Sequence, residues 1–168
     1  MNRRLELGVV ALIAVLDQLT KLLVVARMEL YQTIPIVPGL LNLTHIRNSG
    51  VAFGLFNTAE FSYKPAVMAL VALLALVGVG LYAAQLPASH RWARGGLALI
   101  LGGAAGNLVD RARQGYVVDF VDAYWNGWPF WAFNVADAAI SVGVGLLVID
   151  LFRSEAAAPP AVEEPRVS

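Results

Sequence analysis

Acidic side chains lie within or beside apolar stretches of this chain, where an unpaired carboxylate is costly. Asp137 stands about two turns into a predicted apolar helix and has no Lys or Arg three or four residues away. Its partner must come from elsewhere, and Asp119 and Asp122 in the preceding segment can fold back toward it. Two carboxylates held close together share one proton, so one can deprotonate water while the other polarises a carbonyl. This pattern predicts an aspartic peptidase site, although paired intramembrane aspartates also serve proton-coupled transport.

Other polar residues are spaced so that they share helix faces. Asp17 and Lys21 are four residues apart and can pair, which lowers the cost of either charge in an apolar helix. They form either a scaffold ion pair or a direct contact to substrate, and the sequence leaves both open. Asn107 and Arg111 have the same spacing, with Asp110 between them. These three residues either face a bundle interior or cap and anchor a helix end.

The residue inventory argues against several other hydrolytic chemistries. The chain has no cysteine and only two histidines, His45 and His90, and it contains no H-E-x-x-H zinc motif. The predicted topology places the two histidines on opposite sides of the membrane, and His45 is predicted to be a surface strand residue. No G-x-S-x-G elbow supports a Ser-His-Asp site. Ser-Lys chemistry with Lys21 or Lys64 stays open.

Four apolar stretches could hold these residues in a membrane. They cover 5–25, 66–86, 92–111 and 130–152, and about 20 helical residues are needed to cross a bilayer core. The chain is 58% hydrophobic and 14% charged, whereas soluble domains carry roughly 25% charged residues. We therefore predict an all-α integral membrane protein with four transmembrane helices, the third being the weakest because glycines dilute it. The first stretch is interpreted as a retained helix, because no small-residue cleavage site follows it.

The connections between these stretches differ in character. Segment 28–64 contains prolines, a glycine and an alternating apolar pattern at 41–46, which predict a small extracytoplasmic β-containing segment between the first two helices. Segment 112–129 is both aromatic and acidic, and its aromatic residues favour a membrane interface. Residues 1–153 are predicted to form one domain. Residues 154–168 are rich in Ala, Pro and Glu and are predicted to be a disordered cytoplasmic tail.

With four spans, the ends of the first and third spans and the start of the fourth lie on the same side of the membrane. The polar residues of the spans are found at these three places. Lysines and arginines divide equally between the two sides, so the positive-inside rule alone gives no orientation. If Lys21, Arg47 and Arg111 are discounted as members of polar clusters, both termini are predicted to be cytoplasmic. The site then faces the extracytoplasmic side. A net charge of zero and the lack of a basic run argue against nucleic acid as a partner.

Five segments of the chain resemble, in order, the motifs of the lipoprotein signal peptidase (signal peptidase II) family. Any one could arise by chance, whereas five in order on a four-span chain make a strong match. The resemblance extends from Asp17 to about Ser141. The segments are Asp17-Gln18-Leu19-Thr20-Lys21, Asn48-Ser49-Gly50-Val51-Ala52-Phe53-Gly54, the glycine-rich 102–111 ending in Asp110-Arg111, Val117-Val118-Asp119-Phe120, and Phe133-Asn134-Val135-Ala136-Asp137.

The resemblance implies a bacterial inner-membrane enzyme that removes signal peptides from prolipoproteins, cutting just before a cysteine that carries diacylglycerol. It implies no metal and no cofactor. Its partners would be lipid-modified prolipoproteins and membrane lipids, with no obligate protein partner evident. Segment 28–64 would correspond to the family's extracytoplasmic cradle and segment 112–129 to a lid loop over the site.

The family's functional residues can be carried over one by one. Its catalytic aspartates correspond to Asp119 and Asp137, and only the family pattern prefers Asp119 to Asp122. Its substrate-binding or supporting residues correspond to Asp17, Lys21, Asn48, Gly50, Asn107, Asp110, Arg111 and Asn134. The chain departs from the pattern slightly, with Val51 where alanine is usual and Ala138 where serine is frequent. Neither change removes a proposed catalytic group.

Two other functions compete with this interpretation. A small proton- or ion-coupled transporter could use Asp17, Lys21, Asp110 and Asp137 as a relay, but it would favour polar residues distributed through the membrane depth. A non-enzymatic assembly factor would leave the buried aspartates unexplained. The one-sided distribution of polar residues favours the peptidase.

Overall fold

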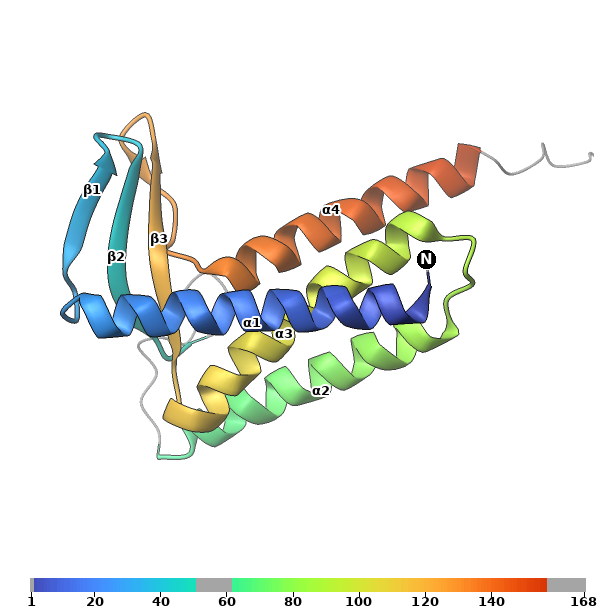
Figure 1. Ribbon diagram of the computed structural model, residues 1–168, viewed down its shortest axis with the longest axis horizontal. Coiled ribbons are helices and arrows are strands. Elements are labelled where there is room, and N and C mark those ends of the chain that lie inside the picture. The colour runs from blue at the N-terminus through green and yellow to red at the C-terminus, as the bar shows by residue number, and fades with distance from the viewer. Residues whose placement is uncertain (1, 51–61, 157–168) are drawn as a thin grey trace, which may run out of the picture.

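The computed structural model describes residues 2–50 and 62–156 of the chain. Within these ranges, four helices form a bundle and a small antiparallel sheet lies at one end of it (Figure 1). The helices are α1 (Arg3–Arg27), α2 (Lys64–Gln85), α3 (Arg91–Gln114) and α4 (Val135–Ala156). The strands are β1 (Thr33–Val37), β2 (Leu41–Asn48), β3 (Val117–Trp125) and β4 (Trp128–Pro129).

Three helices of the described chain are long and apolar enough to cross a membrane: α1, α2 and the part Val135–Arg153 of α4. The sequence predicts four spans. α3 is not apolar enough to count as the fourth by composition, because it has charged residues near both ends and glycines between them. α3 instead lies inside the bundle and contacts the other three helices. A helix covered by its neighbours can use small residues for close packing and need not present apolar side chains to lipid.

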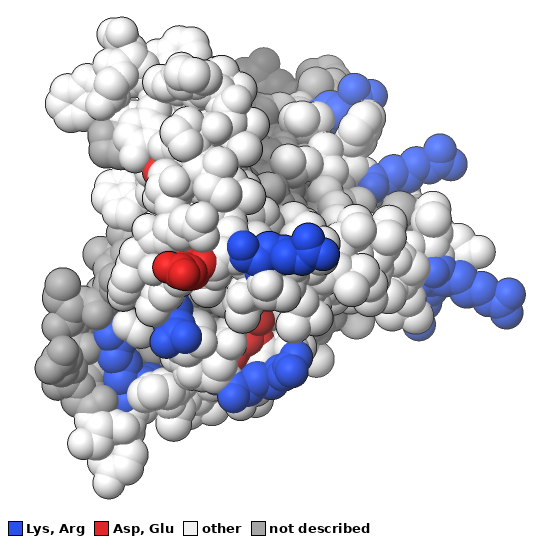
Figure 2. Space-filling model, turned by 60° about the vertical axis from the view of Figure 1, so that its left-hand side comes forward, with Lys and Arg blue, Asp and Glu red and all other residues white. Residues whose placement is uncertain are grey.

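The surface of the bundle is apolar, while its interior holds charges. On α1 the buried residues are Asp17, Lys21 and Val24, whereas Leu12 and Leu19 are more than half exposed. Figure 2 shows one face of the molecule, on which most of the surface is uncharged. This distribution reverses that of a soluble protein. It is the arrangement expected where lipid covers the outside and polar groups must find partners inside.

The sheet has the strand order β1-β2-β3-β4, with antiparallel pairs. The insert between α1 and α2 supplies β1 and β2, as the alternating pattern predicts. The expectation of a loop over 112–129 is wrong, because Val117–Trp125 forms the strand that pairs with β2. Its β-branched and aromatic residues fit a half-buried pleated surface as well as a membrane interface, so composition alone did not separate the two. Asp119, one of the two predicted catalytic residues, therefore lies in a strand of the sheet.

Two helix ends set the positions of the site residues. α3 is followed by its C-cap Gly115, whose φ of 79° is in the left-handed region, and this turn leads the chain directly into β3. The predicted fourth span begins at 130, but α4 begins only at Val135. Asp137 is therefore in the first turn of α4 and not about two turns into it. The helix starts there because Asn134 caps it.

α3 and α4 pack closely through facing glycines. A Cβ atom on Gly96 would lie 2.5 Å from the Gly143 carbonyl oxygen, and one on Gly143 would lie 2.5 Å from the Gly96 carbonyl oxygen. Both obstacles are backbone atoms, which cannot move aside as a flexible side chain can. The neighbouring Gly95 is different, since its Cβ would meet only Leu146 Cδ1 at 4.0 Å. Small residues here allow the helix backbones to approach.

We expect Gly96→Ala to destabilise the protein by about 1–3 kcal/mol, the usual cost of overpacking a close contact. Gly95→Ala is the matched control and should be neutral or slightly stabilising, because alanine favours a helix more than glycine does. Thermal unfolding of both variants in detergent measures the difference. Equal melting temperatures for the two variants would contradict the close contact between α3 and α4.

Candidate active site

Asp119 lies in β3 with only 2% of its surface exposed. Its Oδ1 accepts a hydrogen bond from Asn134 Nδ2 at 2.7 Å, and its Oδ2 accepts one from Asn48 Nδ2 at 3.0 Å. Asn134 precedes α4, and Asn48 ends β2, the strand beside β3. The carboxyl group is therefore held from two different elements of the fold.

Asp137 is held by the start of its own helix. Asp137 N donates to Asn134 Oδ1 at 3.0 Å, and Asn134 N donates to Asp137 Oδ2 at 3.2 Å. This reciprocal arrangement is a capping box, in which the residue before the helix and the third residue of the helix satisfy each other's backbone donors. The other carboxyl oxygen, Asp137 Oδ1, accepts from Asn107 Nδ2 on α3 at 2.8 Å. Local capping thus fixes the side chain at the start of α4.

Asn134 joins the two aspartates. Its side-chain amide donates to Asp119, and its backbone N–H donates to Asp137. The residue is 1% exposed, and its Nδ2 also lies 3.3 Å from the carbonyl oxygen of Val118 and from Asn107 Oδ1. A single buried residue therefore brings the strand that carries Asp119 against the helix that carries Asp137.

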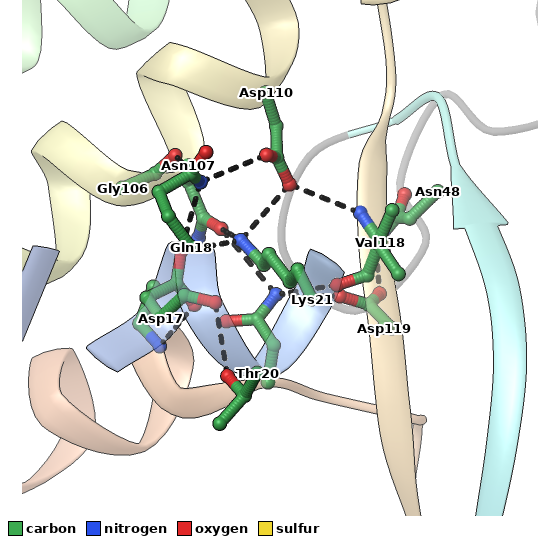
Figure 3. Close-up of polar contacts among 12 residues, drawn as sticks. Asp17, Gln18, Thr20, Lys21, Asn48, Gly106, Asn107, Asp110, Val118 and Asp119 are labelled. Carbon is green, nitrogen blue, oxygen red and sulfur yellow. Dashed lines mark hydrogen bonds and ion pairs between the residues drawn. The ribbon is translucent and has the colours of Figure 1, made fainter. Parts of the chain in front are cut away.

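A buried ion cluster supports this pair from the side of α1 (Figure 3). Lys21 Nζ lies 2.7 Å from Asp17 Oδ2, 3.0 Å from Asp110 Oδ2 and 2.8 Å from Asn107 Oδ1. Asp17 Oδ1 accepts from the backbone N–H of Ala136 in the first turn of α4 at 2.9 Å. Asp17 and Lys21 are almost fully buried and contact protein groups on several sides, so the geometry favours the scaffold interpretation over direct contact with substrate.

Asp110 connects this cluster to β3, because its Oδ2 accepts from Val118 N, one residue before Asp119, at 3.2 Å. Gln18 also belongs to this network, although it was not among the predicted site residues. Its Nε2 donates to Asp110 Oδ1 at 2.9 Å and to the Gly106 carbonyl oxygen at 3.1 Å. Two sequence signals pointed to this role: its place between Asp17 and Lys21 in the first motif, and its position among the polar residues of the first span.

The end of β2 completes the predicted set. Gly50 N donates to Asn48 Oδ1 at 3.0 Å, and Arg111 Nη2 donates to the Gly50 carbonyl oxygen at 2.6 Å. Arg111 also interacts electrostatically with Asp119 and Asp137. The structure thus brings all ten predicted site residues into one connected network. Val51, a noted departure from the family pattern, lies outside the described residues.

Asp122 and His45 lie elsewhere. Asp122 is three positions after Asp119 in β3, so its side chain points to the other face of the strand. There it accepts from Tyr124 OH at 2.8 Å and from Asn42 Nδ2 at 3.3 Å. His45, expected at the surface, is 4% exposed, and its Nδ1 lies 3.1 Å from the Met28 carbonyl oxygen. The prediction of a surface position was wrong because β2 packs against the end of α1, which buries His45.

The electrostatics of the site favour a shared proton. Burial and, to a smaller extent, the charge of Asp137 raise the pKa of Asp119 to about 7, against the lowering effects of Asn48, Asn134 and Lys21. Between pH 3.8 and about 7, Asp119 therefore keeps its proton, whereas a free aspartate is ionised. Among the described residues, no three His, Cys, Asp or Glu side chains are grouped so as to hold a metal ion.

A sequence model of the family described as Signal peptidase (SPase) II matches residues 9–153. The chain belongs to this family. It is 46% identical over 156 residues to the lipoprotein signal peptidase of Geobacter metallireducens, covering 92% of this chain and 94% of that protein. It is 42% identical to the lipoprotein signal peptidase of Haemophilus influenzae, covering 84% of this chain and 81% of that protein. The family expected from the five motifs is therefore confirmed.

Solved structures agree with this assignment. A bacterial membrane enzyme determined by the in meso method at 2.3 Å resolution has a TM-score of 0.80 and 26% identity, with 94% of each chain covered. A second such structure, at 1.9 Å resolution, has a TM-score of 0.78 and 26% identity, covering 88% of this chain and 92% of that one. Together with the apolar helices, the family places this chain among bacterial membrane proteins.

The raised pKa of Asp119 predicts a pH-dependent stability. Between its ordinary value of 3.8 and about 7, the folded protein keeps a proton that the unfolded chain releases. The stability of the wild type should therefore fall as pH rises through this window, whereas Asp119→Asn lacks this contribution. We expect the melting temperature of Asp119→Asn, relative to wild type, to increase from pH 5 to pH 8 in detergent. Asp122→Asn is the control, and an equal pH trend in both variants would contradict the assignment to Asp119.

Proposed function

We propose that this protein is a membrane aspartic endopeptidase that removes the signal peptide from diacylglyceryl-modified prolipoproteins, cutting just before the lipid-modified cysteine. The observation that carries the proposal is the bridge made by Asn134, which donates hydrogen bonds to both Asp119 and Asp137. The proposal is supported by membership in the signal peptidase II family and by the names of the relatives.

The two aspartates have different tasks in this mechanism. Asp119, with its raised pKa, carries the proton and polarises the carbonyl of the scissile peptide bond. Asp137, which accepts hydrogen bonds from Asn107 and from the backbone of Asn134, acts as the carboxylate that takes a proton from water. The water oxygen bonds to the carbonyl carbon as the carbonyl oxygen takes the proton of Asp119. When the C–N bond breaks, the proton held by Asp137 passes to the leaving amine, and Asp119 regains a proton from the intermediate.

The supporting residues hold this geometry. Asp17, Lys21, Asn107 and Asp110 tie α1, α3 and α4 together beneath the aspartates, while Arg111 and Gly50 hold the end of β2 beside them. Catalytic groups must be kept close to their productive geometry by neighbours that are themselves fixed. In this proposal, the lipid-modified precursor and the surrounding membrane lipids are the partners of the site.

We further propose that α3 crosses the bacterial inner membrane with the three apolar helices, giving four spans. Both termini would then be cytoplasmic, and the site would open toward the extracytoplasmic side. In support, the network meets α1 at Asp17 and Lys21, in the half of the helix that ends at Arg27 and leads into the sheet. A lipid-modified cysteine at the outer interface would meet the aspartates at the boundary between water and lipid.

A transporter is not supported by the family or by the polar geometry. Asp17 and Asp110 both pair with Lys21, and the three residues form one cluster at the sheet end of the bundle. A relay would need polar groups distributed through the membrane depth.

We expect Asp119→Asn and Asp137→Asn each to lower cleavage of a purified diacylglyceryl-modified precursor by at least about a thousandfold, because either change removes one half of the proton-sharing pair. Cleavage is followed by the shift of the precursor on a gel. Asp122→Asn should retain most activity, since its side chain is on the other face of β3.

These three variants decide the assignment together. Near-normal turnover by Asp119→Asn or Asp137→Asn would exclude an aspartic mechanism at this pair. A loss of activity in Asp122→Asn as deep as that in Asp119→Asn would contradict the assignment of the catalytic role to Asp119. It would show that the two faces of β3 do not differ in function.

The proposed orientation can be tested by cysteine labelling, because the natural chain has no cysteine. Glu29→Cys lies just after α1 at the sheet end, and Ser89→Cys lies in the connection between α2 and α3. Both positions are exposed. In intact cells, a thiol reagent that does not cross the inner membrane should label Glu29→Cys and not Ser89→Cys, with both labelled after lysis. The opposite labelling pattern would show that the chain is oriented in the reverse of the proposed direction.

A further inference from the structure

Three asparagine side chains surround the two aspartates, and each amide must be oriented to be useful. An amide has an acceptor end and a donor end, and a half-turn exchanges them. A carboxylate needs the donor end. Asn134 and Asn48 present Nδ2 to Asp119, and Asn107 presents Nδ2 to Asp137. If any of these amides turned over, an oxygen would face a carboxylate oxygen.

Two of the three amides are oriented by backbone donors. Asn134 Oδ1 accepts from Asp137 N at 3.0 Å, and Asn48 Oδ1 accepts from Gly50 N at 3.0 Å. A backbone N–H can only donate, so the oxygen of each amide must face it and the Nδ2 end faces Asp119. These orientations follow from the chain itself.

Asn107 is oriented by a side chain. Its Oδ1 accepts from Lys21 Nζ at 2.8 Å and, at the longer distance of 3.3 Å, from Asn134 Nδ2. An ammonium group is a donor only, with three N–H bonds. Lys21 has three acceptors around it, Asp17 Oδ2, Asp110 Oδ2 and Asn107 Oδ1, so each N–H has its own partner. The two carboxylates hold the ammonium group so that its third donor points at Asn107.

We propose that Lys21 is a positioning residue that acts through Asn107: by fixing the oxygen end of that amide, it directs the amide nitrogen to Asp137 and holds this carboxylate ready to take a proton from water. The inference rests on the proposed function of Asp119 and Asp137. It assigns Lys21 neither to substrate contact nor only to the pairing of α1 with α3. The charge of the ion cluster serves to orient one hydrogen bond, from the Asn107 amide to Asp137.

Charge and donor capacity can be separated with two double variants. Asp17→Asn/Lys21→Met and Asp17→Asn/Lys21→Gln remove the same charges, but only glutamine keeps an N–H near Asn107. The amide that replaces the Asp17 carboxylate can still accept from Ala136 N, which protects the start of α4. We expect the methionine form to have a kcat about ten- to a hundredfold below the glutamine form, as for a lost hydrogen bond to an oriented group, with KM for the precursor within about twofold.

The same pair is then compared in an Asn107→Ala background. If Lys21 acts through Asn107, the ratio of kcat between the glutamine and methionine forms should shrink to about one, because the group that transmits the effect is gone. A ratio that persists unchanged without Asn107, or equal kcat in the two original forms, would overturn the proposal. So would a change confined to KM, which would indicate substrate contact.

Glu6→Gln is the matched control. It weakens another contact between α1 and α3, the pair of Glu6 with Arg94 at 2.6 Å, at the other end of the same helices. Glu6→Gln should leave kcat unchanged in folded protein. A loss of kcat similar to that of the methionine form would show that kcat depends on α1–α3 packing in general, and this would overturn the proposal. Wild type and Asp119→Asn are run in the same assay. Failure of wild type to cut the precursor, or activity in Asp119→Asn, removes the proposed function itself, whereas failure of the Lys21 comparison alone leaves it intact.

Discussion

The ammonium group of Lys21 is the charge on which the rest of the structure depends. An ion moved into an apolar interior costs several kcal/mol unless partners compensate it. Lys21 is 3% exposed and meets this constraint with Asp17 from its own helix and with Asp110 and Asn107 from α3. Asp17 in turn accepts from the start of α4. One buried cation therefore fixes how three helices meet, and no buried side-chain polar atom in the described part of the chain lacks a partner.

This requirement explains why α3 is poor in large apolar side chains. A Cβ on Gly106 would lie 2.5 Å from Asp17 Oδ2, so a glycine there leaves room for the carboxylate. Gly96 and Gly103 give similar room against α4. Close approach of the backbones brings Asn107 and Asp110 near α1 and α4 simultaneously. The lower hydropathy of α3 is thus the consequence of its central place, and contact with lipid falls to the other helices.

The site uses the boundary between the bundle and the sheet. Asp137 belongs to the first turn of a helix, Asp119 belongs to a strand, and Asn134 lies just before that helix and reaches that strand. A helix start offers backbone donors to a carboxylate, while a buried strand excludes water from the other carboxyl group. The two environments differ, and such a difference separates the roles of two residues of the same type.

The sequence by itself determined the membrane character, the family, the three most apolar helices and the residue types of the site, because composition, apolar length and local motifs are properties of short stretches. It did not determine that 117–125 is a strand, that α4 begins after Asn134, or which of Asp119 and Asp122 faces Asp137 without the family pattern. Those outcomes depend on contacts between distant residues, such as Asp17 with Ala136, 119 positions away. The orientation of each asparagine amide was likewise decided only in three dimensions, because an amide has no preferred end until a fixed donor lies beside it.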